Sequence, residues 1–420
     1  MDILTQTNNF ETIINEIINE TKVIGLKSIE KTLELIDDKL SALRDTNRFI
    51  IKKKVSRTIL TSIGKITFKR RYYYDCLDNR YVYLLDSNIK IPRYSRISSE
   101  LKLRFINGLA TCSYKTVSEV LSPGLDKVST KTIYNILHKS SFSFKYYDFL
   151  NSFDVIHLQI DEKMISKRSI NGTYKSRLYT ATIFTDCDKS KKRHKLINRT
   201  IISNQSLKYL FKNINYVLHN CYHIKSNSKL YISGDLAIYI QNSPSRIVFP
   251  CIPIYVPDKF HLVRSFKQLF NINLTKDIIY DNEFHNIILD ALNNSFDNRY
   301  SNEYRKLYKC LKYNFDSLKL WYSHDYLGCS QEGMNSHYFA PRFDKVPNSF
   351  SSEGISKLSI ILNAKYNNLD LIIDLNEDYI SINDFKIDTS DIFHEIEHHF
   401  ISFEQYKHSQ RKLLRAISGL

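Results

Sequence analysis

Apolar residues recur along the chain with different periods, and each period predicts a different kind of element. Between residues 10 and 45 the spacing is helical and charged residues fill the other face, which predicts one or two amphipathic helices. Local packing is the simpler role for these helices, and dimerisation is the alternative. From residue 57 to 87 the pattern alternates and is broken at Ile63-Gly64-Lys65, which predicts a β-hairpin followed by another strand over 80–86.

Helical spacing returns between residues 99 and 138 in three short segments. The last segment follows a break at Gly124, and Ser129 or Thr130 can cap its first turn. This arrangement predicts a helix-turn-helix, although an ordinary helical subdomain would give the same pattern. In a DNA-binding helix-turn-helix, residues near the start of the last helix enter the major groove. The candidates at that position are Lys131, Thr132 and Asn135.

Beyond residue 154, buried strands and helical segments follow one another in an informative order. Strands are expected at 155–160, 176–185, 194–203, 229–235 and 246–256, and helices at 206–218, from 236 and at 258–270. Three strands, a helix, a strand, a helix and a strand form the element order of a ribonuclease-H-like α/β fold. Residues 271–327 are polar with helical stretches and predict a helical insertion, after which helices are expected from Glu332 and over 352–369.

These patterns divide an α/β chain into consecutive regions. They are an N-terminal helical region (1–55), a small β region (56–98), a helix-turn-helix DNA-binding domain (99–150), the first part of the ribonuclease-H-like core (151–270), a helical insertion (271–327), the second part of the core (328–370) and a C-terminal tail (371–420).

The charge of the chain points to a class of partner. It carries 60 Lys and Arg against 44 Asp and Glu, a net charge of +16, and such a basic surface favours a polyanion, most often nucleic acid. In the alternating segment, Arg70 and Arg71 adjoin the tyrosines 72–74, a mixture that suits DNA backbone contact and base stacking. A half-buried sheet face would show the same mixture, so both interpretations stay open.

Cysteine usage and hydropathy bear on the compartment. The seven cysteines include no Cys-x-x-Cys pair, which argues against a disulfide framework and a zinc ribbon and fits a reducing cytosol. No run of about 18 apolar residues occurs. We therefore expect a cytoplasmic protein without a membrane segment, associated with the nucleoid when it is bound to DNA.

Three carboxylates stand where a catalytic site would need them. Asp161 and Asp235 end two of the predicted strands, and sites in α/β sheets lie at such strand ends. Glu332 opens a later helix. Three carboxylates brought together repel one another unless cations neutralise them, and hard oxygen ligands suit Mg²⁺ or Mn²⁺. We expect two such ions here, whereas each acid taken alone is better explained as a surface or capping group. Glu162 should point to the opposite face of its strand.

One competing motif lies near the C-terminus. His394-Glu395-Ile396-Glu397-His398 has the H-E-x-x-H pattern, which on a helix can bind zinc. Glu397 places a charge between the ligands, where such helices are usually apolar, so a charged and solvated helix face is the better explanation.

Several longer stretches match one known family. They are RTILTSIGKITFKRRYYYD, VSTKTIYNIL, LQIDEK, SGD, PDKFHL and GCSQEGMNSHYFAPR, between about residues 57 and 367. Through them the chain resembles the DDE transposases of bacterial insertion sequences, closest to the ISLre type of low-GC bacteria and mycoplasmas. GCSQEG followed by SHYFAPR is the most specific piece.

This resemblance implies a DNA transposase that uses two Mg²⁺ or Mn²⁺ ions to cleave and transfer strands at the ends of a mobile element. It implies Asp161, Asp235 and Glu332 as the catalytic triad. Asp258 and His261 occupy an Asp/Cys-x-x-His element found in related families. The partners would be double-stranded DNA, at the element ends and the target, and further copies of the chain in an active homo-oligomer.

Two other functions remain open. A ribonuclease-H-like nuclease without strand transfer would use the same acids, and a catalytically inactive DNA-binding protein would use only the basic surface. His337, five residues after Glu332, is a further accessory candidate, because a histidine there could orient a phosphate or a metal-bound water. A structural, hydrogen-bonded histidine is the alternative for both His337 and His261.

Overall fold

The computed structural model describes residues 9–124, 126–188, 190, 195–294, 301–344 and 349–382. The side chains of Gln331 and Glu332 lie outside this description, although their backbone is included. The chain divides into two compact units. The first comprises Met1–Ile106, Tyr114–Ile136 and Leu375–Leu420, and the second comprises Asn107–Ser113 and Leu137–Asp374.

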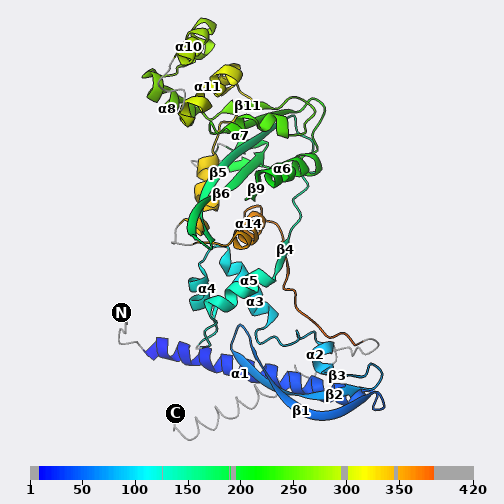
Figure 1. The fold of residues 1–420 in the computed structure, drawn as a ribbon. Coiled ribbons are helices and arrows are strands. Elements are labelled where there is room, and N and C mark those ends of the chain that lie inside the picture. The colour runs from blue at the N-terminus through cyan, green and yellow to red at the C-terminus, as the bar shows by residue number, and fades with distance from the viewer. Residues whose placement is uncertain are drawn as a thin grey trace. The chain divides into compact units, whose positions relative to one another are not determined.

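The first unit is built on one long helix and a small antiparallel sheet (Figure 1). Helix α1 (Asn9–Leu43) is a single helix, and the sheet has the order β1-β2-β3 from β1 (Phe49–Leu60), β2 (Lys65–Asp75) and β3 (Arg80–Val82). The hairpin turn falls where the sequence predicts it, and residues alternate between buried and exposed along β2. The predicted third strand is wrong in its second half, because Leu84, Leu85 and Asp86 belong to helix α2 (Leu84–Asn88).

Acidic side chains of α1 complete the hydrogen bonding of the sheet. Glu34 accepts from the backbone N–H of Lys69 at 2.7 Å, and Asp37 accepts from that of Arg71 at 3.1 Å. Strand β3 pairs only with residues 73–75 of β2, so these N–H groups face no strand. Exposed strand donors invite association with other chains, and the carboxylates of α1 remove that risk here.

Three helices follow: α3 (Ser99–Leu109), α4 (Tyr114–Leu121) and α5 (Thr130–Lys139). Ser129 caps α5, as the sequence predicts, because its hydroxyl accepts from the backbone N–H of Thr132 at 3.1 Å. The Ser118 hydroxyl donates to the Val128 carbonyl and so ties α4 to the segment that leads into α5.

The second unit contains a five-stranded mixed sheet. Its order is β11-β10-β5-β6-β9, from β11 (Ile254–Pro257), β10 (Lys229–Gly234), β5 (Val155–Ser169), β6 (Gly172–Phe184) and β9 (Thr200–Asn204). Strands β5, β6 and β9 are antiparallel neighbours, whereas β10 runs parallel to both β5 and β11. The unit is therefore mixed α/β, with its parallel strands on one side of β5.

Three predicted strand boundaries need correction. Strand β5 does not end at Asp161 but continues to Ser169 as one arm of the hairpin with β6, while its parallel pairing with β10 ends at Ile160. Strand β11 occupies only the last part of the predicted segment 246–256, after two prolines. The predicted strand 194–203 is two strands, β8 (Lys195–Ile197), which pairs with β7 (Asp186–Asp188), and β9.

Helices surround this sheet. In chain order they are α6 (Leu207–Cys221), α7 (Ile238–Gln241), the 3-10 helix η1 (Ser243–Arg246), α8 (Lys259–Phe270), α9 (Lys276–Tyr280), α10 (Asn282–Asn294), α11 (Asn302–Asn314), the 3-10 helix η2 (Asp316–Tyr322), α12 (Gln331–Tyr338), α13 (Ala340–Phe343) and α14 (Ser352–Tyr366). Within the described part of the expected helical segment 271–327 lie α9, α10, α11 and η2. A short pair of strands, β4 (Ser141–Ser143) and β12 (Ile372–Asp374), lies outside the main sheet.

The core of the second unit lies between the sheet and these helices. Fully buried side chains of β5 and β10, such as Leu158 and Ile232, pack with Ile214 of α6 and Leu262 of α8. The free edge of β9 is covered by Asn367, whose amide bonds both the N–H and the carbonyl of Ile201 at 2.7 Å. Within the described residues, no helix is long and apolar enough to cross a membrane.

Candidate functional site

A cavity of about 220 Å³ opens where the parallel pairing of β5, β10 and β11 ends. Its lining comes from four segments of the chain: Ile160, Asp161, Gly234, Asp235, Asp258, Phe260, His261, Cys329, Ser330 and Gly333. The sheet order makes this convergence necessary, because adjacent parallel strands present their carboxyl ends at one edge. Four candidates from the sequence, two aspartates of the expected triad and the Asp-x-x-His pair, therefore line one cavity.

Asp161 lies on β5, immediately after the last residue that pairs with β10. Its Oδ1 accepts from the backbone N–H of Glu162 at 2.7 Å, and its Oδ2 accepts from the Asn335 amide at 2.7 Å. Burial, and to a lesser extent the charge of Asp235, raises the pKa of Asp161 to about 6. The carboxylate form is thus disfavoured here unless a cation approaches.

Asp235 follows directly after β10. Its Oδ1 accepts from the backbone N–H of Ala237 at 2.8 Å, and its main-chain carbonyl accepts from the Tyr255 hydroxyl of β11 at 2.8 Å. These two bonds fix both the carboxylate and the backbone that carries it. Among the described residues, no side chain or backbone group donates to the other carboxylate oxygen of Asp235.

Gly234 sets the distance between the two aspartates. It pairs with Ile160, and a Cβ atom added to Gly234 would lie 2.4 Å from the Ile160 carbonyl oxygen and 3.0 Å from the Ile240 side chain. The group that approaches this glycine most closely is the backbone of β5. A larger residue would force apart the strands that carry Asp161 and Asp235.

Asp258 and His261 form a capped pair at the start of α8. Asp258 is the N-cap, and its carboxylate accepts from the backbone N–H of Phe260 and pairs with the His261 ring. The Asp258 backbone N–H donates to the Gly234 carbonyl at 2.9 Å, which ties the cap to the end of β10. His261 is thus hydrogen-bonded, as its structural interpretation expects, and it also lines the cavity, where its functional role stays a prediction.

The segment before α12 is fastened to the sheet by side chains. The buried amide of Gln159 donates to the Gly328 carbonyl at 3.0 Å and accepts from the Ser330 backbone N–H at 3.1 Å. The Tyr326 hydroxyl and the Ser233 hydroxyl are 3.0 Å apart. These bonds hold the start of α12, where Glu332 is located, at the strand ends.

Sequence comparison places the chain in a family. Residues 3–372 match the family described as "Uncharacterised protein family (UPF0236)". The chain belongs to this family. Among its relatives is the UPF0236 protein TTE2489 of Caldanaerobacter subterraneus subsp. tengcongensis, which is 24% identical over 85% of this chain and 79% of the relative. Another protein of that organism, 23% identical over 85% of this chain and 78% of its own length, has a name that joins eleven locus designations.

Three carboxylates, those of Asp161, Asp235 and Asp258, line the cavity of this UPF0236 member. Carboxylate oxygens are ligands that hard divalent cations prefer, and burial, followed by the charge of Asp235, raises the pKa of Asp161. Among described side chains, no group of three or more His, Cys, Asp or Glu residues is arranged to hold a metal ion. Glu332, whose side chain is not among those described, lies between Ser330 and Gly333, which line the cavity.

Sequence reasoning missed two polar residues that organise this UPF0236 site. Asn335 is 5% exposed and bridges Asp161 to Thr180, whose hydroxyl donates to its amide oxygen at 2.8 Å. Gln159 is 1% exposed and holds the 328–330 segment. The sequence does contain a signal for Asn335. Residues three apart on a helix share a face, and Asn335 comes three residues after Glu332.

Other candidates lie away from the cavity. Glu162 pairs with Arg177 at 3.2 Å and does not line the cavity, as expected for the opposite face of β5. His337 is exposed in the last turn of α12 and is not part of the lining. The H-E-x-x-H motif at 394–398 lies outside the described residues.

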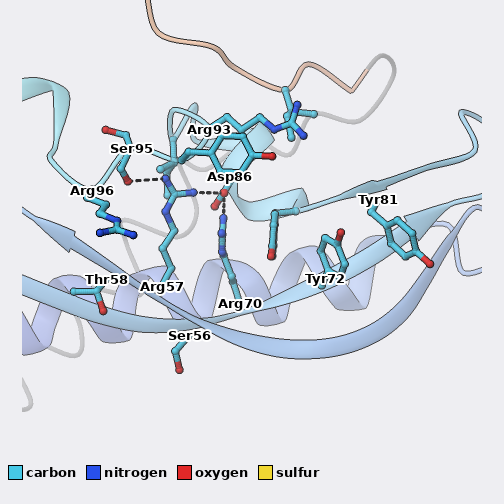
Figure 2. A pocket seen from close by; sticks show the side chains of 14 residues that line it. Ser56, Arg57, Thr58, Arg70, Tyr72, Tyr81, Asp86, Arg93, Ser95 and Arg96 are labelled. Atoms are coloured by element: carbon cyan, nitrogen blue, oxygen red, sulfur yellow. Dashed lines mark hydrogen bonds and ion pairs between the residues drawn. The ribbon is translucent and has the colours of Figure 1, made fainter. Parts of the chain in front are cut away.

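The two arginines proposed for DNA contact are engaged in internal ion pairs. Arg70 is buried against Asp86 (Figure 2), and Arg71 pairs with Asp37 and Asp38, each at 2.7 Å. Arg70 is therefore buried on its face of the sheet, as the alternative interpretation of this segment expects, and its contact with DNA stays a prediction. On α5, Lys131 and Asn135 are exposed, whereas Thr132 is half-buried and bonded to Ser129.

Proposed function

We propose that this UPF0236 protein is a DNA transposase of the DDE type, which cleaves and joins DNA strands at the ends of a mobile element. Its second unit would be a ribonuclease-H-like core. Support for that fold comes from the strand order β9-β6-β5-β10-β11, with three antiparallel strands followed by two strands parallel to β5. The helices α3 to α5 would form the helix-turn-helix.

One observation carries the proposal. Asp161 and Asp235 follow paired positions on adjacent parallel strands and line a single cavity, whose wall includes residues on both sides of Glu332. Acids that are merely solvated or capping have no reason to converge in this way. In the proposed mechanism Asp161 stands at the centre of the site, Asp235 on one side, and Glu332 completes the set from α12.

The donor set would hold two Mg²⁺ or Mn²⁺ ions. Such ions would supply activation of a water or a 3′-hydroxyl and stabilisation of charge on the leaving oxygen. The chain itself would orient the carboxylates: Asn335 holds one oxygen of Asp161, and the Ala237 N–H holds one oxygen of Asp235. His261, kept in place by Asp258, lies where it can contact a phosphate.

Two further observations favour a mobile element and a DNA substrate. A relative whose name joins eleven locus designations is what a repeated element would produce. The net charge of +16 suits DNA at the element ends and at the target. The active complex would be a homo-oligomer on DNA, at the nucleoid, because two ends must be joined to one target.

The test is Mg²⁺- or Mn²⁺-dependent nicking and strand transfer on a labelled duplex that contains the element end. We expect both reactions. Cleavage without joining would replace the transposase with a nuclease of the same fold. DNA binding with neither reaction in either metal would leave a DNA-binding protein and refute the catalytic proposal.

A first prediction concerns Asn335. Replacing Asn335 with alanine removes the bond that orients Asp161 and should lower cleavage about ten- to hundredfold, since partners of metal ligands have effects of this size. Higher metal concentration should restore part of the rate. Ser336→Ala, at the next and exposed position of α12, is the matched control and should cleave normally. Equal rates for the two variants would remove Asn335 from the site.

A second prediction concerns the exposed face of α5. Lys131→Ala with Asn135→Ala should weaken binding to the element end more than binding to unrelated duplex, because base contacts specify and phosphate contacts do not. A loss of about 1–3 kcal/mol per base contact is expected, measured by titration with both duplexes. Lys127→Ala removes an exposed lysine before α5 and serves as the charge control. Equal losses on the two duplexes would assign α5 to backbone contact only.

A further inference from the structure

A second cavity, of about 430 Å³, lies entirely within the first unit (Figure 2). It is formed by β1, β2, β3, α2 and the segment 91–96, with one contribution from Ile380. Four arginines and four tyrosines line it, against a single carboxylate: Arg57, Arg70, Arg93, Arg96, Tyr72, Tyr81, Tyr83, Tyr94 and Asp86. None of these residues belongs to the carboxylate site of the second unit.

The inner part of this cavity holds more positive than negative charge. Arg57 and Arg70 each expose 9% of their side chains, and both pair with Asp86, as the dashed lines in Figure 2 indicate. The buried Nε of Arg70 has no acceptor among the described residues. Burial, and then the charge of Arg57, lowers the pKa of Arg70 to about 10. Buried charges are normally paired, so a second anion is missing from this group.

The outer part of the cavity is aromatic. Tyr72 and Tyr81 stack with ring centroids 5.1 Å apart and planes 12° apart. Tyr94 is 82% exposed, has a φ of 58°, and lies 4.8 Å beneath the guanidinium of Arg93. A tyrosine in the left-handed region is uncommon and costs conformational energy, which a binding role would explain. The rim therefore offers flat rings and a guanidinium plane to a ligand.

We propose that this cavity binds one nucleotide of an unpaired DNA strand, with the phosphate at Arg70 and the base against the tyrosine rings of the rim. The phosphate supplies the missing anion, and Arg is suited to hold it. Bases stack on tyrosine and on guanidinium planes without regard to sequence. A base stacked inside a duplex exposes no face to these rings, so an unpaired nucleotide fits better than a base pair.

The proposal takes the identity of the polymer from the proposed function but concerns a separate site. An acidic peptide could satisfy Arg70 but offers no plane for the tyrosines. A free mononucleotide carries the same chemistry as one unit of a strand. An acidic peptide and a free mononucleotide are therefore used as competitors in the test.

The test uses the full chain and an oligothymidine strand of about 12 nucleotides, in which 5-iododeoxyuridine replaces one thymidine. Irradiation joins the iodinated base to the ring that stacks on it, and peptide mapping identifies that ring. We expect adducts at Tyr72, Tyr81 or Tyr94. The same adducts should form in the Asp161→Asn variant, in which catalysis is expected to fail. Adducts only between residues 137 and 374 would overturn the proposal and leave the catalytic one intact.

Competition identifies the ligand. Unlabelled single strand should suppress the adduct at far lower concentration than thymidine monophosphate, inorganic phosphate or a glutamate-rich peptide. If the mononucleotide competes as well as the strand, the site is not a DNA-strand site. If the glutamate-rich peptide or inorganic phosphate competes as well as the strand, the base does not contribute to binding and the proposal fails.

Exposed rim residues allow variants that leave the buried ion pairs intact. Tyr94→Ala should weaken single-strand binding about tenfold, whereas Tyr94→Phe keeps the ring and should bind as the parent does. Arg93→Ala removes the guanidinium plane of the rim and should also weaken single-strand binding. Arg80→Ala, an exposed arginine of β3 outside the cavity, is the charge control. Equal losses for Tyr94→Phe and Tyr94→Ala would rule out stacking.

Discussion

Replacing Asp161 or Asp235 with asparagine should lower metal-dependent DNA cleavage by at least about a thousandfold, or about 4 kcal/mol of transition-state stabilisation. Each substitution keeps the shape of the side chain and removes one charge from the cavity that both residues line. Glu332→Gln should have the same effect if Glu332 completes the site. In the proposed mechanism the carboxylates hold the metal ions, so the loss of one charge should weaken metal binding and with it the cleavage that the ions would support.

The double variant and the control variant test whether the carboxylates act as one catalytic unit. Combining Asp161→Asn with Asp235→Asn should cost little more than either change alone, because each disables the same unit. DNA binding should persist, and may be measured on the same labelled duplex. Glu162→Gln is the matched control, since Glu162 is the next residue of β5 and pairs with Arg177 outside the cavity. Near-normal cleavage in both aspartate variants would refute the mechanism.

The two aspartates could be predicted from the sequence because their signal is local. Each follows a run of apolar residues that is buried in the structure, as in β10, where five consecutive residues from Leu230 to Gly234 are buried. Each carboxylate comes directly after the last residue of a buried, parallel-paired run, and so lies where that pairing ends. Parallel neighbours then bring Asp161 and Asp235 together without further information.

The continuation of β5 could not be predicted in the same way. After Asp161 the strand is only partly buried, and its charged residues, such as Lys163, resemble a loop. Pairing with β6, rather than burial, keeps this part extended. The contacts that orient the site could not be predicted either. Asn335 and Asp161 are 174 positions apart in the sequence, and only the fold brings them into contact.

Arg70 shows how a local signal can be misinterpreted. Its charge suggested a surface position, yet Ile66, Phe68 and Arg70 alternate along β2 and are all buried. The alternation of residues along β2 therefore predicted correctly that Arg70 faces the buried side of the sheet, whereas its charge suggested the exposed side. A carboxylate on another element, Asp86, makes the burial of Arg70 tolerable, and no local pattern points to it.

Gly234→Ala should reduce both the stability of the second unit and the rate of cleavage. The new methyl group would lie 2.4 Å from the Ile160 carbonyl oxygen, which is main chain and cannot turn away, so β10 must move from β5. Overpacking of this kind costs about 1–3 kcal/mol. Because the displaced pair directly precedes Asp161 and Asp235, a shift approaching 1 Å should also cost about a hundredfold in cleavage.

The single tryptophan reports on this region. Trp321 donates to the Pro257 carbonyl at the end of β11, at 2.9 Å, so its fluorescence should follow the unfolding of the sheet that contains β10. We expect the urea midpoint to fall by roughly 1 M in Gly234→Ala. Gly333→Ala is the control for stability, since a Cβ there meets open space in α12 and should be neutral or slightly stabilising. An unchanged midpoint together with full cleavage in Gly234→Ala would show that the spacing of β5 and β10 does not control the site.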